Sequence, residues 1–260
     1  MRFLPESFGQ LIDLTKLFLN DNHLKSLPEF FGNLKHLQLL NLYGNKVKVL
    51  PESFGNLHHL TFLNLRNNLL MSLPESFGQL VNLKKLFLGL NQLIFLPESF
   101  GNLQNLGHLE LKRNGLKTLP ESFGNLQNLR RLELQDNQLS ALPETFGRLT
   151  DLQDLFLDNN QLVSLPDSFR NLTTLCSLGF EDNPLAGMII LLWRLSYLHR
   201  AWIPQSLLNH PLLQSLDVSS LHPLPNDSCP FCGILGLVYG QEKPSDKTRV
   251  FCMRCELRLS

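Results

Sequence analysis

The chain has 260 residues, and its 23 lysines and arginines are balanced by 23 aspartates and glutamates, so its formal net charge at pH 7 is zero. A chain without net charge has no long-range field that would attract nucleic acid or an anionic membrane, so we expect neither as a partner. The N-terminal stretch lacks the basic and apolar pattern of a secretory signal, and we therefore expect a cytoplasmic protein.

A phrase of the form LPxxFGxL recurs along about two thirds of the chain. Its proline stands at positions 5, 28, 51, 74, 97, 120, 143 and 166, so the repeat length is 23 residues. A strict period of this length indicates that each repeat is one supersecondary unit, which buries its apolar face only by stacking on its neighbours. The sequence therefore predicts a solenoid of about eight repeats over residues 1–183.

Within each repeat, leucines alternate with variable residues over a short stretch. In residues 96–116, LPESFGNLQNLGHLELKRNGL, Leu109 and Leu111 are separated by Glu110 and preceded by His108. This period of two is typical of a strand with one buried face, so the leucines point inward and the variable residues point outward. Stacked copies of such a strand form a parallel sheet.

The spacing LxxLxLxxNxL resembles the signature of leucine-rich repeat proteins, and its LPxxFGxL variant resembles the 23-residue intracellular class of Ras-binding and scaffold proteins. The resemblance covers roughly residues 3–185. It implies an α/β fold, namely a curved horseshoe solenoid with a parallel β-sheet on its concave face. It also implies a scaffold that binds proteins in intracellular signalling.

Three further columns of the repeat have predicted structural roles. An asparagine that follows each strand can satisfy buried backbone groups of adjacent turns. We expect the glycines to allow a tight or left-handed turn before the next strand, and the phenylalanines to fill the convex side of the core. The columns are Asn22, Asn45, Asn68, Asn91, Asn114, Asn137, Asn160 and Asn183; Gly9, Gly32, Gly55, Gly78, Gly101, Gly124 and Gly147; and Phe8, Phe31, Phe54, Phe77, Phe100, Phe123, Phe146 and Phe169.

Both ends of the array depart from the repeat. The sequence begins MRFLPESFG, inside a repeat and without a capping unit, which leaves an atypical first turn or lost upstream repeats; we favour the second. After Asn183 the run LAGMIILLWRLSYL predicts a helix within residues 184–202 that caps the last repeat. Its uninterrupted apolar part is shorter than the roughly 20 residues that span a bilayer. Residues 203–227, which contain four prolines, predict a linker.

Residues 228–260 contain four of the five cysteines. Cys229 and Cys232 form one CxxC pair, Cys252 and Cys255 form another, and 19 residues separate the pairs. This spacing is typical of a four-cysteine zinc site, because two facing turns supply four thiolates to a tetrahedral metal. Two disulfides or a redox CxxC motif are the alternatives, but nothing in the sequence indicates an oxidising compartment. We therefore expect a structural zinc ion in a small zinc-ribbon-like tail.

The outward positions of the predicted strands form the candidate binding surface. Aromatic and apolar side chains gather in the early repeats, basic side chains in the middle, and acids (Asp154, Asp158, Glu181, Asp182) at the far end. Large apolar side chains on the solvent side of a sheet are unnecessary for stacking, and exposed aromatics flanked by arginines are typical of interface anchors. The predicted partner-binding residues are Phe18, Leu39, Tyr43, Phe62, Arg66, Lys85, Phe87, Lys112 and Arg131.

Among function classes, a non-enzymatic scaffold that binds a protein on the concave face is favoured. The alternative is a substrate-recognition subunit of a multi-subunit ubiquitin ligase, because IPQSLL (203–208) and HPLP (222–225) faintly resemble adaptor-docking boxes. A cysteine-nucleophile enzyme is disfavoured, because the tail is short and commits its cysteines to metal. We expect no small-molecule substrate.

The predicted metal site can be tested by metal analysis of protein purified under reducing conditions. We expect about one zinc ion per chain, because four thiolates complete one tetrahedral shell. Cys229→Ser or Cys252→Ser should remove the metal and loosen the tail alone, because solenoid stability is a sum of neighbouring repeat terms. Protein that contains no zinc and has four freely titratable thiols in the tail would disprove the site.

Overall fold

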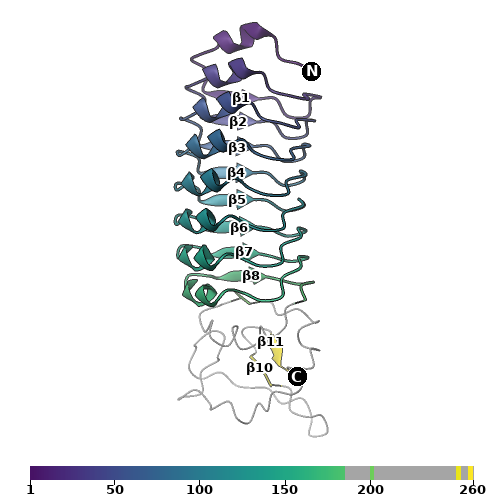
Figure 1. Ribbon diagram of the computed structural model, residues 1–260, viewed down its shortest axis with the longest axis vertical. Helices are drawn as coiled ribbons and strands as arrows, with labels where there is room; N and C mark the ends of the chain where they lie inside the picture. Colours follow the sequence, from purple (N-terminus) through teal and green to yellow (C-terminus); the bar gives the residue numbers. More distant parts are fainter. Residues whose placement is uncertain (185–199, 202–249, 253–256, 260) are drawn as a thin grey trace.

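The computed structural model describes residues 1–184, 200–201, 250–252 and 257–259 of the chain. Its main body is a stack of repeats in which a three-residue strand alternates with a five-residue 3-10 helix (Figure 1). The 3-10 helices are η1 (Glu6–Gln10), η2 (Glu29–Asn33), η3 (Glu52–Asn56), η4 (Glu75–Gln79), η5 (Glu98–Asn102), η6 (Glu121–Asn125), η7 (Glu144–Arg148) and η8 (Asp167–Asn171). The strands of the stack are β1 (Lys16–Phe18), β2 (Leu39–Asn41), β3 (Phe62–Asn64), β4 (Lys85–Phe87), β5 (His108–Glu110), β6 (Arg131–Glu133), β7 (Asp154–Phe156) and β8 (Ser177–Gly179).

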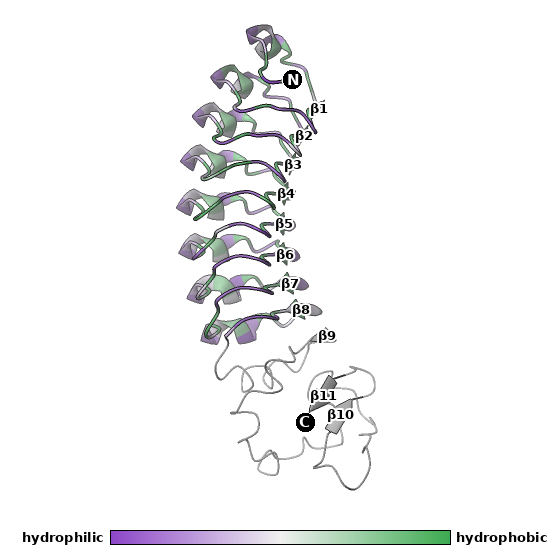
Figure 2. Ribbon diagram, turned by 90° about the vertical axis from the view of Figure 1, so that its right-hand side faces the viewer, coloured by the Kyte–Doolittle hydropathy of each residue, from purple (hydrophilic) through white to green (hydrophobic). Residues whose placement is uncertain are grey.

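The strands form one parallel sheet in sequence order, and each residue pairs with the residue one repeat later, as Leu40 does with Leu63. Figure 2 shows the sheet on the inner side of the curved stack and the 3-10 helices on its outer side. The predicted solenoid with a concave parallel sheet is therefore confirmed for residues 1–183. The helical half of each described repeat is a 3-10 turn rather than an α-helix.

Each 3-10 helix begins directly after the repeat's proline. Pro51, for example, has φ −68° and ψ 155°, so its ring holds the extended conformation that precedes the turn. The helix then points one phenylalanine into the core. The rings from Phe31 to Phe169 stack nearly parallel, with centroids of adjacent rings 6.1–6.2 Å apart, and are fully buried. The predicted convex core is thus confirmed for these seven rings, while Phe8 is partly buried.

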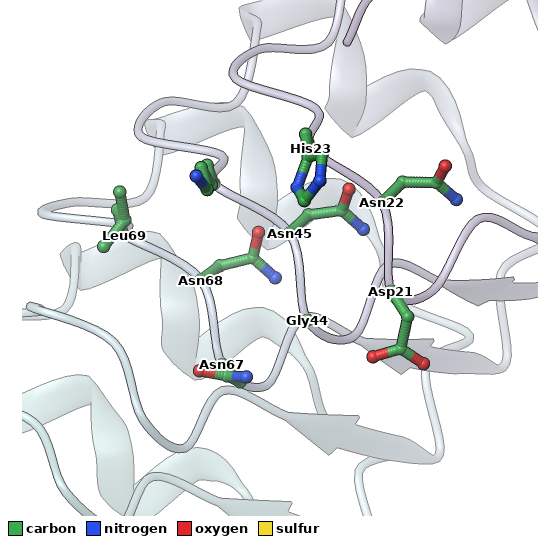
Figure 3. A pocket seen from close by; sticks show the side chains of 9 residues that line it. Asp21, Asn22, His23, Gly44, Asn45, Asn67, Asn68 and Leu69 are labelled. Atoms are coloured by element: carbon green, nitrogen blue, oxygen red, sulfur yellow. The ribbon is translucent and has the colours of Figure 1, made fainter. Parts of the chain in front are cut away.

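The asparagine column links the backbones of successive repeats, as predicted. The Asn45 amide donates to the carbonyl oxygens of Leu19 (2.9 Å) and Leu42 (3.0 Å), and its Oδ1 accepts the Leu24 N–H (3.0 Å). Figure 3 shows Asn45 and Asn68, which belong to two successive repeats, side by side. Buried backbone groups that the short strands leave unpaired are satisfied in this way.

The glycine column has a different role from the predicted one. These glycines lie within the 3-10 helices and have no left-handed φ. A Cβ on Gly78 would lie 2.7 Å from the Ser99 Cβ and still closer to the Ser99 carbonyl oxygen, so glycine is required by the close approach of the next repeat. Left-handed φ values, from 53° to 68°, occur one position before each asparagine, at Asp21, Gly44, Asn67, Leu90, Arg113, Asp136, Asn159 and Asp182.

The sheet extends one strand beyond the leucine pattern. β9 (Arg200–Ala201) pairs in parallel with β8, with Ser177 opposite Arg200. Residues 200–201 are therefore strand and not the end of a capping helix over 184–202, because Ser177 and Leu178 pair with the residues 23 positions later in the chain. The rest of that range, apart from Pro184, and the linker 203–227 lie outside the described residues.

In the tail, β10 (Val250–Cys252) pairs antiparallel with β11 (Leu257–Leu259). Cys252 is the last residue of β10, while Cys229, Cys232 and Cys255 lie outside the described residues. The zinc site stays a prediction. None of the helices in the described part of the chain has the length and apolar character that crossing a membrane requires.

Two Gly→Ala substitutions test whether the glycine column is required for close packing between repeats or for backbone freedom. Gly78→Ala should lower the free energy of unfolding by about 1–3 kcal/mol, because the new methyl group overlaps Ser99 of the next repeat. Gly115→Ala is the matched control, because its Cβ would approach only the Leu93 carbonyl oxygen, at 3.5 Å, and it should be neutral or stabilise by up to about 1 kcal/mol. Equal effects in urea denaturation would contradict this account of the glycine column.

Candidate functional site

The concave face is formed by the first and third residues of each strand. The middle residue of each strand, such as Leu63, is buried, so its two neighbours lie on the inner curve of the sheet. Phe18 is 62% exposed and Lys85 is exposed, whereas the other predicted partner-binding residues are partly buried. The structure therefore places the predicted strand residues on one surface, with Tyr43, Arg66 and Lys112 in the loops that follow their strands.

An aromatic strip, defined as Leu39, Phe62, Phe87 and His108, crosses four adjacent strands of this surface. Leu39 pairs in register with Phe62. The ring centroids of Phe62 and Phe87 are 5.5 Å apart in a tilted arrangement. The centroids of Phe87 and the His108 imidazole are 5.0 Å apart in an edge-to-face arrangement. These tilted geometries are the favourable ones for aromatic pairs. The strip is thus a preorganised apolar surface on β2–β5.

Glu133 lies at the centre of a cluster of cations beside the strip. Its Oε2 accepts a hydrogen bond from Lys112 Nζ (2.8 Å), and its Oε1 accepts one from Arg131 Nε (2.9 Å) and lies 3.4 Å from His108 Nε2. The hydrogen bonds with His108, Lys112 and Arg131 hold the pKa of Glu133 far below its ordinary value, although burial acts in the opposite direction.

Glu110 occupies a similar position one repeat earlier. Its Oε1 lies 3.4 Å from Arg66 Nη1 and 3.7 Å from Lys112 Nζ. The carboxylate fits there because residue 89 is glycine, whose added Cβ would overlap Glu110 Oε1. Glu110 and Glu133 are only 3% and 6% exposed. The sequence-based expectation that Glu110 points into solvent is therefore wrong in part: it faces the concave side but lies beneath its cations.

Three cations of the predicted basic group, Arg66, Lys112 and Arg131, are consequently neutralised within the fold, whereas Lys85 stays exposed. Glu110 pairs with Arg66 and Lys112, and Glu133 pairs with Lys112 and Arg131. In addition, Arg131 Nη1 lies 3.6 Å from Asp154 Oδ2. The Arg131 guanidinium stacks 5.1 Å from the centroid of the Phe156 ring as well. Reasoning from the sequence missed Glu110, Glu133 and His108 as parts of this site.

The acidic end of the face contains like charges. Burial, together with the charges of Asp136 and Asp182, raises the pKa of Asp158, although the Glu181 N–H donates to Asp158 Oδ1 at 2.9 Å. Burial and the neighbouring Asp158 and Asp182 also raise the pKa of Glu181. Among the described residues, no group of three or more His, Cys, Asp or Glu side chains has an arrangement that could hold a metal ion.

A shallow pocket of about 590 Å³ lies on the loops that follow the first three strands (Figure 3). Its floor includes Asn45 and Asn68, whose amide groups already bond to backbone carbonyl oxygens. Asp21, His23 and Asn67 lie at the exposed rim. The amides of the pocket floor are therefore already used by the asparagine column, and the polar groups that remain are those of the exposed rim.

Comparisons with known proteins agree with the repeat architecture. A family model described as a leucine-rich repeat region matches residues 5–90 and 96–183. The comparison with curated proteins returned no match. Among solved structures, the leucine-rich repeat protein LIC12759 of Leptospira interrogans is 33% identical with a TM-score of 0.61, and the match covers 79% of this chain and 59% of the Leptospira chain.

Two plant receptors are also similar. The leucine-rich repeat ectodomain of the membrane receptor kinase GASSHO1/SCHENGEN3 of Arabidopsis thaliana, solved in complex with CASPARIAN STRIP INTEGRITY FACTOR 2, is 31% identical with a TM-score of 0.61. The match covers 78% of this chain and 28% of the ectodomain chain. The plant peptide hormone receptor RGFR1, solved in complex with RGF2, is 29% identical with a TM-score of 0.58 over 77% of this chain and 38% of the receptor. This chain thus covers less than two thirds of each of the three proteins.

The role of Glu133 predicts a pH-dependent stability. Glu133→Gln should lower the free energy of unfolding at pH 7 by about 1–3 kcal/mol, because three cationic or polar partners lose their anion. Since the pKa of Glu133 is depressed in the folded state, this contribution is present above the ordinary value of 4.5 and is lost as the pH falls below it.

The difference between wild type and Glu133→Gln should therefore narrow on acidification, as measured by urea denaturation from pH 7 to pH 3. The control is Glu75→Gln, a change of an exposed carboxylate outside the described ion pairs, which should be nearly neutral. A Glu133→Gln effect that is absent at pH 7, or constant across this range, would rule out the proposed charge cluster.

Proposed function

This chain belongs to the leucine-rich repeat family, and from that premise we propose that it binds a protein partner on the concave face of its sheet. Leucine-rich repeat proteins commonly bind protein partners, and two similar structures are receptors in complex with CASPARIAN STRIP INTEGRITY FACTOR 2 and RGF2. The proposed role is that of a non-enzymatic scaffold.

The observation that carries this proposal is the aromatic strip. The interior of each repeat is already filled by leucines and one phenylalanine with near-zero exposure, so Phe62 and Phe87 add nothing that the core lacks. They nevertheless stay partly exposed on the inner curve, and Phe18 in β1 is 62% exposed. Preformed aromatic surfaces that remain in contact with water are typical of the energetic centres of protein interfaces.

The charge cluster indicates how the rest of the face acts. Arg66, Lys112 and Arg131 are paired with Glu110, Glu133 and Asp154, so they offer a polar rim with little net charge. A partner therefore gains most from apolar or aromatic side chains placed on the strip, and the paired charges around it fix orientation. Lys85 is opposite Phe62 in the sheet and adds an exposed cation at the edge of the strip.

Finer parts of the sequence-based reading stay predictions. These are the intracellular Ras-binding and scaffold class, a signalling role, cytoplasmic localisation and the structural zinc ion. The same holds for the alternative of a ubiquitin-ligase substrate-recognition subunit, since residues 203–208 and 222–225 lie outside the described residues.

The concave site can be tested by affinity capture of the tagged full chain from cells, with quantitative comparison between variants. The double variant Phe62→Ala/Phe87→Ala should capture a specific partner in an amount reduced by about tenfold or more. The reason is that truncating an interface anchor costs roughly 2 kcal/mol or more of binding free energy. The double substitution leaves the buried leucines untouched, so the variant should retain its circular dichroism spectrum.

Val163→Ala is the control, since Val163 is 54% exposed but lies outside the sheet, in the connection before η8. It should capture the same partners in the same amounts as wild type. If the aromatic variant folds and captures every partner at the wild-type level, the concave strip is not the binding surface.

A further inference from the structure

A second candidate surface lies on the side of the solenoid, in the segment that leads from the asparagine loop to the next 3-10 helix. In the second to seventh repeats, the residues three and two positions before the proline lie in this segment, with a buried leucine or valine on each side of the pair. In the fifth repeat Ile94 and Phe95 are 47% and 54% exposed, whereas Leu93 and Leu96 are 0% and 5% exposed. Side chains in these two rows therefore project away from the core, and they do not belong to the strands of the concave face.

Four large apolar side chains gather in these rows over three consecutive repeats. Val49 is 61% exposed and Met71 is 54% exposed, and with Ile94 and Phe95 they form what we term the lateral patch. On either side of these repeats, backbone hydrogen bonds join neighbours in the row three positions before the proline, from Lys48 N to Lys25 O (3.3 Å) and from Lys117 N to Ile94 O (3.4 Å). Single exposed apolar residues need no explanation, but adjacent ones in successive repeats indicate an interaction surface.

Lysines occupy the same row on both sides of the lateral patch. In order along the solenoid, the row three positions before the proline reads Arg2, Lys25, Lys48, Met71, Ile94, Lys117, Ser140 and Val163, so Lys48 and Lys117 directly flank the lateral patch. All three lysines are exposed, and within residues 1–184 none of them forms an ion pair. The surface is thus apolar in the middle and positively charged at both ends.

From this pattern we propose that the lateral patch binds a short acidic segment of another protein, in which two or more adjacent apolar side chains are flanked by carboxylates. The apolar side chains cover Met71, Ile94 and Phe95. The flanking carboxylates face Lys48 and Lys117. Such a small surface suits a weak, reversible contact that adds to the concave site.

Charge rules against two other occupants. A second copy of the chain, related by a two-fold axis in the plane of the patch, would bring Lys48 opposite either Lys48 or Lys117 of the other copy, which is repulsive. An anionic membrane would meet the exposed Glu52, Glu75 and Glu98, which follow the prolines of the same three repeats. A narrow acidic segment that runs along the lysine row places carboxylates opposite Lys48 and Lys117, so no lysine faces another lysine. It also covers less of the surface than a membrane, which would extend over the glutamates.

The experiment is selection of a random dodecapeptide library on the full chain, with depletion on Met71→Ser/Ile94→Ser/Phe95→Ser. We expect enriched peptides with adjacent apolar residues between acidic ones. A synthetic consensus peptide should lose about tenfold or more in affinity for the depletion variant and about tenfold for Lys48→Glu/Lys117→Glu, as measured by fluorescence anisotropy. Phe62→Ser/Phe87→Ser is the matched control on the concave face and should bind this peptide as wild type does.

Several outcomes would overturn the proposal. One is a selection that yields no peptide dependent on the lateral patch, and another is a basic or uncharged consensus. Binding to vesicles that contain phosphatidylserine, lost in the depletion variant, would make the occupant a membrane. A dimer in sedimentation velocity that the same variant abolishes would make it a second copy. Because the concave variant is measured in parallel, failure here is distinguishable from failure of the concave site.

Discussion

One amide side chain in each repeat connects three stretches of backbone, and the remainder of the solenoid depends on this connection. Asn91 donates to the carbonyl oxygens of Leu65 and Leu88, both at 2.9 Å, and accepts the Leu70 N–H at 3.0 Å. These bonds hold the asparagine loops of two successive repeats in one fixed register. They also hold Leu90, a residue type that rarely has a left-handed φ, at φ 57°.

Because the asparagines, leucines and phenylalanines hold the stack from within, the outward strand residues are free to vary. In two adjacent repeats, for example, the corresponding outward positions hold side chains of different chemistry: Lys85 pairs with His108, and Phe87 pairs with Glu110. What they share is contact with one another across the sheet. The proposed binding surface therefore consists of combinations of side chains one repeat apart, which the constant interior places at a fixed spacing.

Much of this architecture could be predicted from the sequence, because the repeat period, the alternation within LxLxx and the asparagine column are local patterns with one physical interpretation. The role of Gly78 could not, because it is set by Ser99 of the next repeat and not by its own φ. The sequence contained a usable signal for Glu110 and Glu133: each lies within one repeat of a cation, and the 23-residue register brings these side chains together. β9 had only a weak signal, which the reasoning from the sequence missed: Leu198, Ala201 and Ile203 stand 23 residues after Leu175, Leu178 and Phe180.

The central claim is that the asparagine column holds the solenoid together while the aromatic strip does not. Urea denaturation of Asn91→Ala and Phe87→Ala, measured side by side, tests it most directly. The account predicts a loss of about 3 kcal/mol or more for Asn91→Ala, because three hydrogen bonds disappear and backbone groups stay buried without partners, and about 1 kcal/mol for the partly exposed Phe87→Ala. A larger loss for Phe87→Ala than for Asn91→Ala would contradict the account, because the strip would then be part of what holds the fold.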